Sequence, residues 1–351
     1  MFFMKKISLL DLNKEELKHL VKKLGIEDYR SKQLWQWVMQ KGISDFDAMT
    51  NVPKAVRKIL QKISRVGCGI KIADNQVSDD NNTVKYLLEL FDQSTVESVF
   101  MRQPYGQAAC ISTQVGCRMG CYFCASALRG IVRNLSAGEM YEQILTMQKD
   151  MNEKITHIVL MGTGEPLDNY ENTIKFIRNI SDKYALNISL RRITVSTCGL
   201  VPEIKKLVEE KLPITLAVSL HACSDEKRDK LVPINRIYPL SKLITACREY
   251  VSKTGRRVTF EYTLIENVND STSDAVNLAR LLKGMLCHVN LIPLNTVKET
   301  INFKRPSLEQ IKAFKNTLSK YSINATIRKE MGSGIDAACG QLRFKKKKKR
   351  K

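Results

Sequence analysis

Hydrophobic residues in the first eighty positions recur at intervals of three and four, which is the spacing of an amphipathic helix. Three stretches show this pattern: LKHLVKKLG at 17–25, YRSKQLWQWVMQKG at 29–42 and VPKAVRKILQKI at 52–63. Asn13, with Glu16 three positions later, predicts a capping box at the start of the first helix. The chain therefore begins with a helical region.

A different pattern starts after a polar, turn-rich stretch at 74–82. Two strands are expected over 83–91 and 95–101, and from residue 107 onward short apolar strands alternate with amphipathic helices. This alternation predicts a parallel sheet of the α/β class, and six repeats without a dinucleotide fingerprint favour a partial (β/α)6 TIM-like barrel. The six expected strands are 107–113, 156–162, 191–197, 214–220, 257–265 and 288–295.

These patterns predict the organisation of the chain. We expect a helical accessory domain over 1–82, a strand extension over 83–106, a barrel core over 107–343 and a basic tail over 344–351. Chemistry in such barrels gathers at the carboxyl ends of the strands. Polar motifs follow several of the predicted strands, so we expect the site at that edge of the sheet.

The composition of the chain adds one further observation, a large positive net charge. The chain has 57 Lys and Arg against 36 Asp and Glu, a formal net charge of +21 at pH 7. The run KKKKKRK at 345–351 supplies 7 of these charges and leaves a surplus of +14 on the rest. A surplus of this size favours a nucleic acid as the partner, because neutralised phosphates release condensed counterions.

The chain shows no sign of membrane insertion or secretion. No run approaches eighteen apolar residues, and the opening MFFMKKISLLDL lacks a basic region ahead of an apolar stretch. We therefore expect a cytoplasmic protein. Its ten cysteines would stay reduced in that compartment, which favours metal ligation or catalysis over structural disulfides.

Three of these cysteines, Cys117, Cys121 and Cys124, lie within eight positions of one another. A structural zinc site needs four ligands, usually from two Cys-x2-Cys pairs, and here only Cys121 and Cys124 form such a pair. A [4Fe-4S] cluster with three thiolate ligands instead leaves one iron open to a small molecule. The spacing favours the cluster, and zinc completed by a distant cysteine or histidine is the alternative.

The spacing Cys-x3-Cys-x2-Cys, with Phe123 just before the last cysteine, resembles the signature of the radical S-adenosylmethionine (SAM) superfamily. The resemblance implies that the open iron binds the amino and carboxylate groups of SAM. The sequence GTGEP at 162–166 resembles that superfamily's motif for the SAM amino group. It lacks the third glycine of a dinucleotide-binding loop.

Over nearly all of 90–343 the chain also resembles the RlmN/Cfr family of RNA adenosine methyltransferases. The stretches that carry this resemblance are TVESV, AACISTQVGC, RNLSAGE, MGTGEPLDN, RRITVSTCG, LAVSLHA, LVPIN, EYTLIENVND, HVNLIPLN and IDAACGQL. GEP favours the RlmN branch, since Cfr-type enzymes tend to carry GEA. Cys198, in STCG, stands where the family often has another small residue, a departure that we expect to be harmless.

The resemblance implies a specific reaction. It is methylation at C2 of adenosine in 23S ribosomal RNA (adenosine 2503) and in tRNA (adenosine 37), through an S-methylcysteine, with two SAM molecules used per methyl group. The implied cofactors are one [4Fe-4S] cluster and SAM. The implied partners are the two RNAs and a low-potential electron donor of the flavodoxin or ferredoxin type, and a monomer is expected.

The resemblance also assigns residues. Cys339 would carry the methyl group, Cys110 would release the product by forming a disulfide, and either Glu97 or Cys110 would take the C2 proton. The cluster ligands would be Cys117, Cys121 and Cys124. The residues implied to contact SAM are Gly164, Glu165, Ser196, Ser219, Leu220, His221 and Asn295. The remaining cysteines are expected to be buried and inert: Cys68, Cys198, Cys223, Cys247 and Cys287.

Two alternatives stay open at the level of sequence. The first is a Cfr-like enzyme that methylates C8 of adenine with the same parts. The second is a non-catalytic iron-sulfur protein that has kept the fold and binds RNA.

Overall fold

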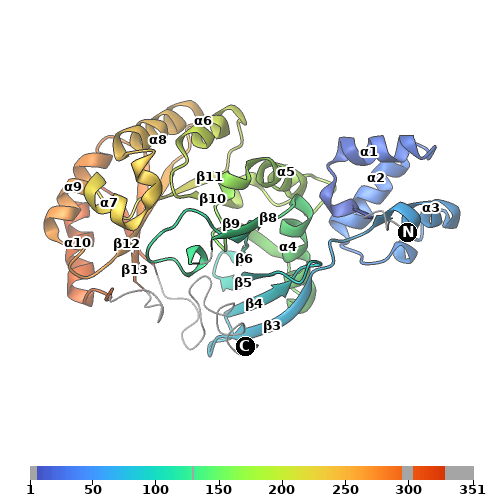
Figure 1. Ribbon diagram of the computed structural model, residues 1–351, viewed down its shortest axis with the longest axis horizontal. Coiled ribbons are helices and arrows are strands. Elements are labelled where there is room, and N and C mark those ends of the chain that lie inside the picture. Colours follow the sequence, from blue (N-terminus) through green and yellow to red (C-terminus); the bar gives the residue numbers. More distant parts are fainter. Residues whose placement is uncertain (1–5, 129, 295–302, 329–351) are drawn as a thin grey trace.

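The computed structural model describes residues 6–128, 130–294 and 303–328. A group of short helices lies beside a larger body built on a ten-stranded sheet (Figure 1). The strand order is β14-β13-β12-β11-β10-β9-β6-β5-β4-β3. The strands predicted from the sequence can be matched to strands of this sheet.

Seven neighbouring strands of this sheet are parallel. They are β6 (Gly106–Cys110), β9 (Ile155–Leu160), β10 (Ile193–Thr197), β11 (Thr215–Ser219), β12 (Val258–Leu264), β13 (Cys287–Pro293) and β14 (Ala325–Ile327). The first six coincide with the six expected strands, which confirms the α/β class. In the described part of the chain β3 and β14 are the two open edges, so the barrel is partial.

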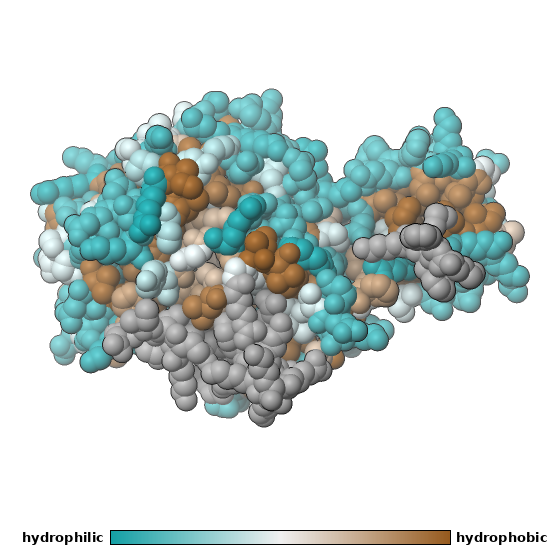
Figure 2. Space-filling model, viewed as in Figure 1, coloured by the Kyte–Doolittle hydropathy of each residue, from teal (hydrophilic) through white to brown (hydrophobic). Residues whose placement is uncertain are grey.

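Helices join the parallel strands and lie around the outside of the sheet (Figure 1). They are α4 (Ala137–Met151), α5 (Tyr170–Ser181), α6 (Val201–Glu209), α7 (Asp225–Leu231), α8 (Leu240–Thr254), α9 (Thr272–Leu282) and α10 (Leu308–Lys320). Hydrophilic residues cover most of the visible surface, with separate apolar areas near its centre and on the N-terminal helices (Figure 2). No helix in the described ranges has the length and apolar character needed to cross a bilayer.

An antiparallel extension continues the sheet beyond β6. It consists of β5 (Thr95–Gln103), β4 (Thr83–Glu89) and β3 (Lys71–Val77). The expected turn over 74–82 is wrong for its first four residues, because Asp74–Val77 pair with β4. Because β3 is largely exposed, polar residues occupy most of its positions. The alternation of apolar and polar residues that is typical of a strand is therefore not visible in its sequence.

The two faces of the sheet differ in polarity. Along β12, Phe260 and Tyr262 point into the main hydrophobic core under the helices, whereas Glu261 and Thr263 point to the opposite, inner face. On β5 and β6 the inner face carries Val99 and Cys110 side by side. The helices therefore cover an apolar face, and the polar side chains that a reaction requires lie on the inner one.

The N-terminal region forms the expected helices. Asn13 accepts from the Glu16 backbone N–H, and Glu16 Oε2 accepts from the Asn13 N–H, both at 2.8 Å, which confirms the capping box. The elements are β1 (Ile7–Ser8), α1 (Lys14–Lys23), α2 (Arg30–Trp35), α3 (Lys54–Ile63) and β2 (Ser64–Arg65), with helical turns at Leu9–Asp11 (3-10), Gln36–Gln40 (π) and Phe46–Ala48 (3-10).

Polar contacts attach this region to α4 and to the end of α5. The Tyr141 hydroxyl donates to the Met39 carbonyl at 2.8 Å, and the buried Trp35 indole donates to Asp182 at 3.2 Å. The Gly138 N–H donates to Asp11 at 2.9 Å. These contacts fix the N-terminal helices against the body of the protein.

We predict that the apolar outer face of β12 is essential to stability. Phe260 is 0% exposed whereas Phe91 is 69% exposed. Phe260→Ala should lower the free energy of unfolding by about 3–5 kcal/mol because it leaves a cavity, while Phe91→Ala should change it by about 0.5 kcal/mol or less. Urea unfolding of anaerobically purified protein measures both values, and equal losses would contradict this account of the core.

Candidate active site

The three clustered cysteines lie on one loop. The strands β7 (Gln114–Gly116) and β8 (Ile131–Asn134) form an antiparallel pair, and residues 117–130 between them are the cysteine loop. The Cys117 N–H donates to the Gly130 carbonyl at 3.0 Å and closes the base of the loop. Gly116 has φ +85°, and a Cβ there would lie 2.1 Å from that carbonyl oxygen. Only glycine fits this position.

The thiols of the cysteine loop are withdrawn from water. Burial raises the pKa of Cys117 to about 12, and it also raises the pKa values of Cys121 and Cys124. Neighbouring thiols of the trio add to the rise at Cys117 and Cys121, so the three side chains lie within electrostatic reach of one another. The thiols are therefore neutral by themselves, and a bound metal would reverse this by favouring the thiolates.

The arrangement of donors fits a cluster better than a single ion. The cysteine loop supplies three thiols, from Cys117, Cys121 and Cys124. A structural zinc would need four such groups at one point. Three thiols on a loop shaped by Gly116 and Gly120 instead match in number the thiolate ligands of a [4Fe-4S] cluster that keeps one iron open, and these residues would hold it.

The GTGEP turn (162–166) interlocks with the strand that leads into the cysteine loop. The Thr163 N–H donates to Ser112 Oγ at 2.9 Å. The Thr163 carbonyl accepts from the N–H groups of Thr113 and Gln114 at 2.9 and 3.1 Å. The turn at the end of β9 is therefore held beside the base of the cysteine loop.

Glu165 completes this interlock from inside the protein. Its N–H donates to Gln114 Oε1 at 2.9 Å, while its carboxylate accepts from the N–H groups of Leu167 at 3.1 Å and Cys198 at 2.7 Å. Burial raises the pKa of Glu165, and the hydrogen bonds from Cys198 oppose that rise. Gly164 has φ +112°, and a Cβ would lie 2.6 Å from Gln114 Cβ. Glu165 thus anchors the turn to Cys198, the residue that follows β10.

The ends of β10 and β11 bring the next predicted SAM contacts to the same edge. The half-buried Ser196 hydroxyl donates to the Leu160 carbonyl at 2.7 Å. Ser219 is the last residue of β11, and the buried Leu220 that follows donates its N–H to the Glu261 carbonyl at 3.0 Å. These residues lie in adjacent strands, as their expected common role requires.

His221 is held by the backbone rather than presented as a base. Its ring Nδ1 accepts from the Thr263 N–H at 3.0 Å, and burial lowers its pKa to about 3. The Asn269 amide donates to the His221 carbonyl at 2.7 Å, which supports the positive φ of +57°. The ring also contacts Phe123 edge to face, with centroids 4.7 Å apart. A neutral His221 therefore packs against the cysteine loop.

Glu97 and Cys110 lie on the inner face near the same loop. Cys110 is directly opposite Val99 across β5 and β6, so Glu97 is its diagonal neighbour. The Glu97 side chain is 4% exposed and its Oε2 lies 3.0 Å from Lys85 Nζ, which is 1% exposed. Burial raises the pKa of Cys124 and the charge of Glu97 adds to that rise, which places Glu97 within reach of the cysteine loop.

Two buried cations near this site were missed at the sequence level. Lys85 lies between the apolar residues Val84 and Tyr86 on β4, a position that could have revealed it, and its ammonium reaches Glu97, its diagonal neighbour on β5. Arg228, in DEKRDKL, gives no such signal, because a buried arginine in a charged helix looks like a solvated one. Its guanidinium donates to the Ser219, Leu220 and Cys198 carbonyls.

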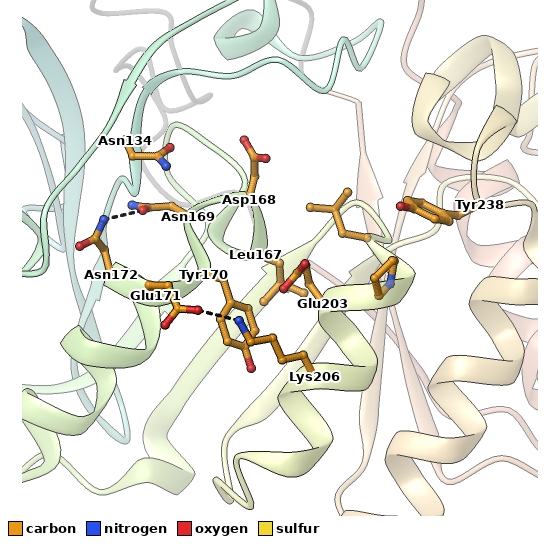
Figure 3. A pocket seen from close by; sticks show the side chains of 12 residues that line it. Asn134, Leu167, Asp168, Asn169, Tyr170, Glu171, Asn172, Glu203, Lys206 and Tyr238 are labelled. Carbon is orange, nitrogen blue, oxygen red and sulfur yellow. Dashed lines mark hydrogen bonds and ion pairs between the residues drawn. The ribbon is translucent and has the colours of Figure 1, made fainter.

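A pocket of about 500 Å³ lies outside the predicted site, between the start of α5 and the start of α6 (Figure 3). Acidic side chains from Asp168, Glu171 and Glu203 face it with Lys206. Asp168 also binds Arg118 in the cysteine loop. None of the predicted site residues lines this pocket.

The other predicted residues either lie outside the described part of the chain or are cysteines that were expected to be inert. Asn295, Cys339 and the basic tail lie outside the described residues. Among the cysteines expected to be inert, Cys247 and Cys287 are buried away from the site, Cys68 lies near Ser8, and the half-buried Cys223 donates to Asp274. Cys198 is different, because it packs in one apolar group with Cys117 and Met119.

The chain matches two family models. Residues 111–279 match the radical SAM superfamily, and residues 7–66 match the N-terminal domain of ribosomal RNA large subunit methyltransferases. A radical SAM methyltransferase from Sphaerobacter thermophilus has a solved structure that superposes with a TM-score of 0.91 at 45% identity, covering 95% of this chain and 98% of that one.

Curated relatives are similar over almost the whole chain. Two proteins named probable dual-specificity RNA methyltransferase RlmN are 51% identical over 338 residues (Desulforamulus reducens) and 53% identical over 342 residues (Alkaliphilus oremlandii). The matches cover 96% and 97% of this chain, and 96% and 99% of those proteins. The expected resemblance is thereby confirmed, and the chain belongs to the RlmN family of RNA methyltransferases within the radical SAM superfamily.

Proposed function

We propose that this chain methylates C2 of adenosine in RNA, at adenosine 2503 of 23S ribosomal RNA and adenosine 37 of tRNA. The observation that carries the proposal is the interlock of the cysteine loop with the GTGEP turn, next to the Glu97 and Cys110 side chains. A cluster, its SAM ligand and an RNA base would then meet at one edge of the sheet. The cytoplasm is the compartment that such RNAs and reduced thiols require.

The target atom explains why this chemistry is needed. C2 of adenine lies between two ring nitrogens and is too electron-poor to attack a sulfonium methyl group. When bound, the cluster and SAM would supply a carbon radical, which can add to such an atom. The protein's part is to hold the groups in place, exclude water and move a proton.

The chain's own residues would divide that work. Cys339 would receive the methyl group as S-methylcysteine. Cys110 would close a disulfide with Cys339 and so free the methylated base. Either Glu97 or Cys110 would take the C2 proton, and the Glu97 carboxylate lies 3.0 Å from the Lys85 ammonium.

The RNA and the electron donor are the proposed partners. The net charge of +21 supports a polyanionic substrate, and the N-terminal helices, fixed against α4 and α5, would bind RNA through its backbone and shape. A flavodoxin or ferredoxin type of donor would supply the low-potential electron, and we expect the chain to act as a monomer. Methylation at C8 of adenine is the main alternative reaction, and it would yield a different methylated nucleoside.

The position of the new methyl group tests the proposed function directly. Anaerobic reaction with SAM, a reductant and transcripts of the two RNAs, followed by nucleoside digestion and mass spectrometry, should yield 2-methyladenosine. Detection of 8-methyladenosine instead would support the Cfr-like alternative. An intact cluster with no methylated nucleoside from either RNA would support the non-catalytic alternative.

The metal content should depend on the cysteine loop alone. Anaerobic reconstitution should give about four irons per chain, because a [4Fe-4S] cluster is expected. Cys121→Ala should lose most of that iron, whereas Cys198→Ala, a matched change in the same apolar group, should retain it. Iron and zinc analysis would reject the cluster if one zinc and no iron were found.

Cys110 should be needed for release and not for attachment. Cys110→Ala should accumulate a covalent protein–RNA adduct, visible as a shifted band on a denaturing gel, because the tether could no longer be resolved. Cys287→Ala is the matched control, since both thiols are 8% exposed and Cys287 lies at the start of β13. Free methylated RNA from the Cys110 variant would contradict the assigned role.

A further inference from the structure

Arg228 is the largest side chain that the described core buries completely. Its Nε donates to the Leu220 carbonyl at 3.1 Å. One terminal nitrogen donates to the carbonyls of Cys198 at 2.6 Å and Ser219 at 3.0 Å, and the other donates to Asn235 Oδ1 at 2.9 Å. The guanidinium therefore ties the end of β10 to the end of β11.

The same helix reaches the cysteine loop. The Tyr122 N–H donates to the Leu231 carbonyl at the end of α7 at 3.0 Å, between the cluster ligands Cys121 and Cys124. Cys198, whose carbonyl accepts from Arg228, packs in one apolar group with Cys117. Arg228 is thus connected to the loop from two sides.

The charge of Arg228 is not directly neutralised. Among the described residues the acceptors of its hydrogen bonds are all uncharged, and the carboxylates in this network lie one group further away. Asp225 and Asp229 accept from the Asn235 amide at 2.9 and 2.7 Å, and Glu165 accepts from the Cys198 N–H at 2.7 Å. Burying a cation without an adjacent anion is costly. A [4Fe-4S] cluster with three thiolate ligands is anionic and gains a further negative charge on reduction, so it would offset that cost.

We propose that Arg228 is a positioning residue that fixes the SAM-side ends of β10 and β11 to the cysteine loop, and that its buried positive charge raises the reduction potential of the cluster. This inference rests on the proposed function only in requiring the cluster. Two effects follow, and they can be separated. The charge acts on the potential, and the fork of hydrogen bonds acts on the affinity for SAM.

Redox titration followed by electron paramagnetic resonance measures the first effect. In Arg228→Met, at a fixed applied potential, the ratio of reduced to oxidised cluster should fall at least tenfold, which is about 59 mV for one electron. Arg228→Lys should keep the wild-type potential but bind SAM several-fold more weakly, because lysine keeps the charge and loses the planar fork. An unchanged potential in an iron-loaded Arg228→Met protein would overturn the proposal.

Arg256 provides the matched control, since it binds the Ile214 carbonyl and Thr215 at the opposite end of β11, and Arg256→Met should leave the potential unchanged. If Arg228→Met fails to retain iron, Arg228→Gln, which keeps a hydrogen-bond donor and removes the charge, decides instead. It should also make the potential more negative, and an unchanged potential would overturn the proposal. Iron content and methylated product of the wild-type protein, measured in the same preparation, keep this outcome distinct from a failure of the proposed function.

Discussion

The backbone interlock between residues 112–114 and the GTGEP turn is the constraint on which the site depends. Thr163 receives and donates hydrogen bonds in this contact, and Glu165 extends it to Cys198 at the next strand. Gly164 permits the close approach, which a side chain at that position would block. These bonds hold the turn beside the strand that leads into the cysteine loop. A cofactor that contacts both the cysteine loop and the turn would therefore meet a binding site whose two halves are already positioned.

Buried charge is the second organising feature. The inner face holds the Lys85 and Glu97 pair at 3.0 Å, and the neighbouring strand ends surround Arg228. A buried ion pair is weak evidence for stability, because desolvation offsets most of the attraction. Under the proposed function, these groups would hold fixed charge at the sheet edge where a radical and a proton would move. The apolar outer face under the helices supplies the stability that this arrangement requires.

Much of this could be predicted from the sequence, for physical reasons. The parallel strands from β6 to β13 are short segments rich in apolar residues that alternate with helical patterns, and the Asn13 and Glu16 pair marks a helix start. The three-residue strand β14 and the exposed polar strand β3 leave no comparable pattern. Cys117, Cys121 and Cys124 are local in the sequence and so were recognisable as a set. The roles of Glu165 and Arg228 depend on contacts between distant strands, and the neutral state of His221 depends on burial, which a single sequence does not record.

In the proposed site three thiolates would leave one iron open beside the GTGEP turn for SAM. Electron-nuclear double resonance on the reduced protein with SAM labelled at its amino nitrogen tests this most directly. The account predicts a nitrogen hyperfine coupling large enough to require direct bonding to iron. A spectrum that is identical with labelled and unlabelled SAM would contradict it.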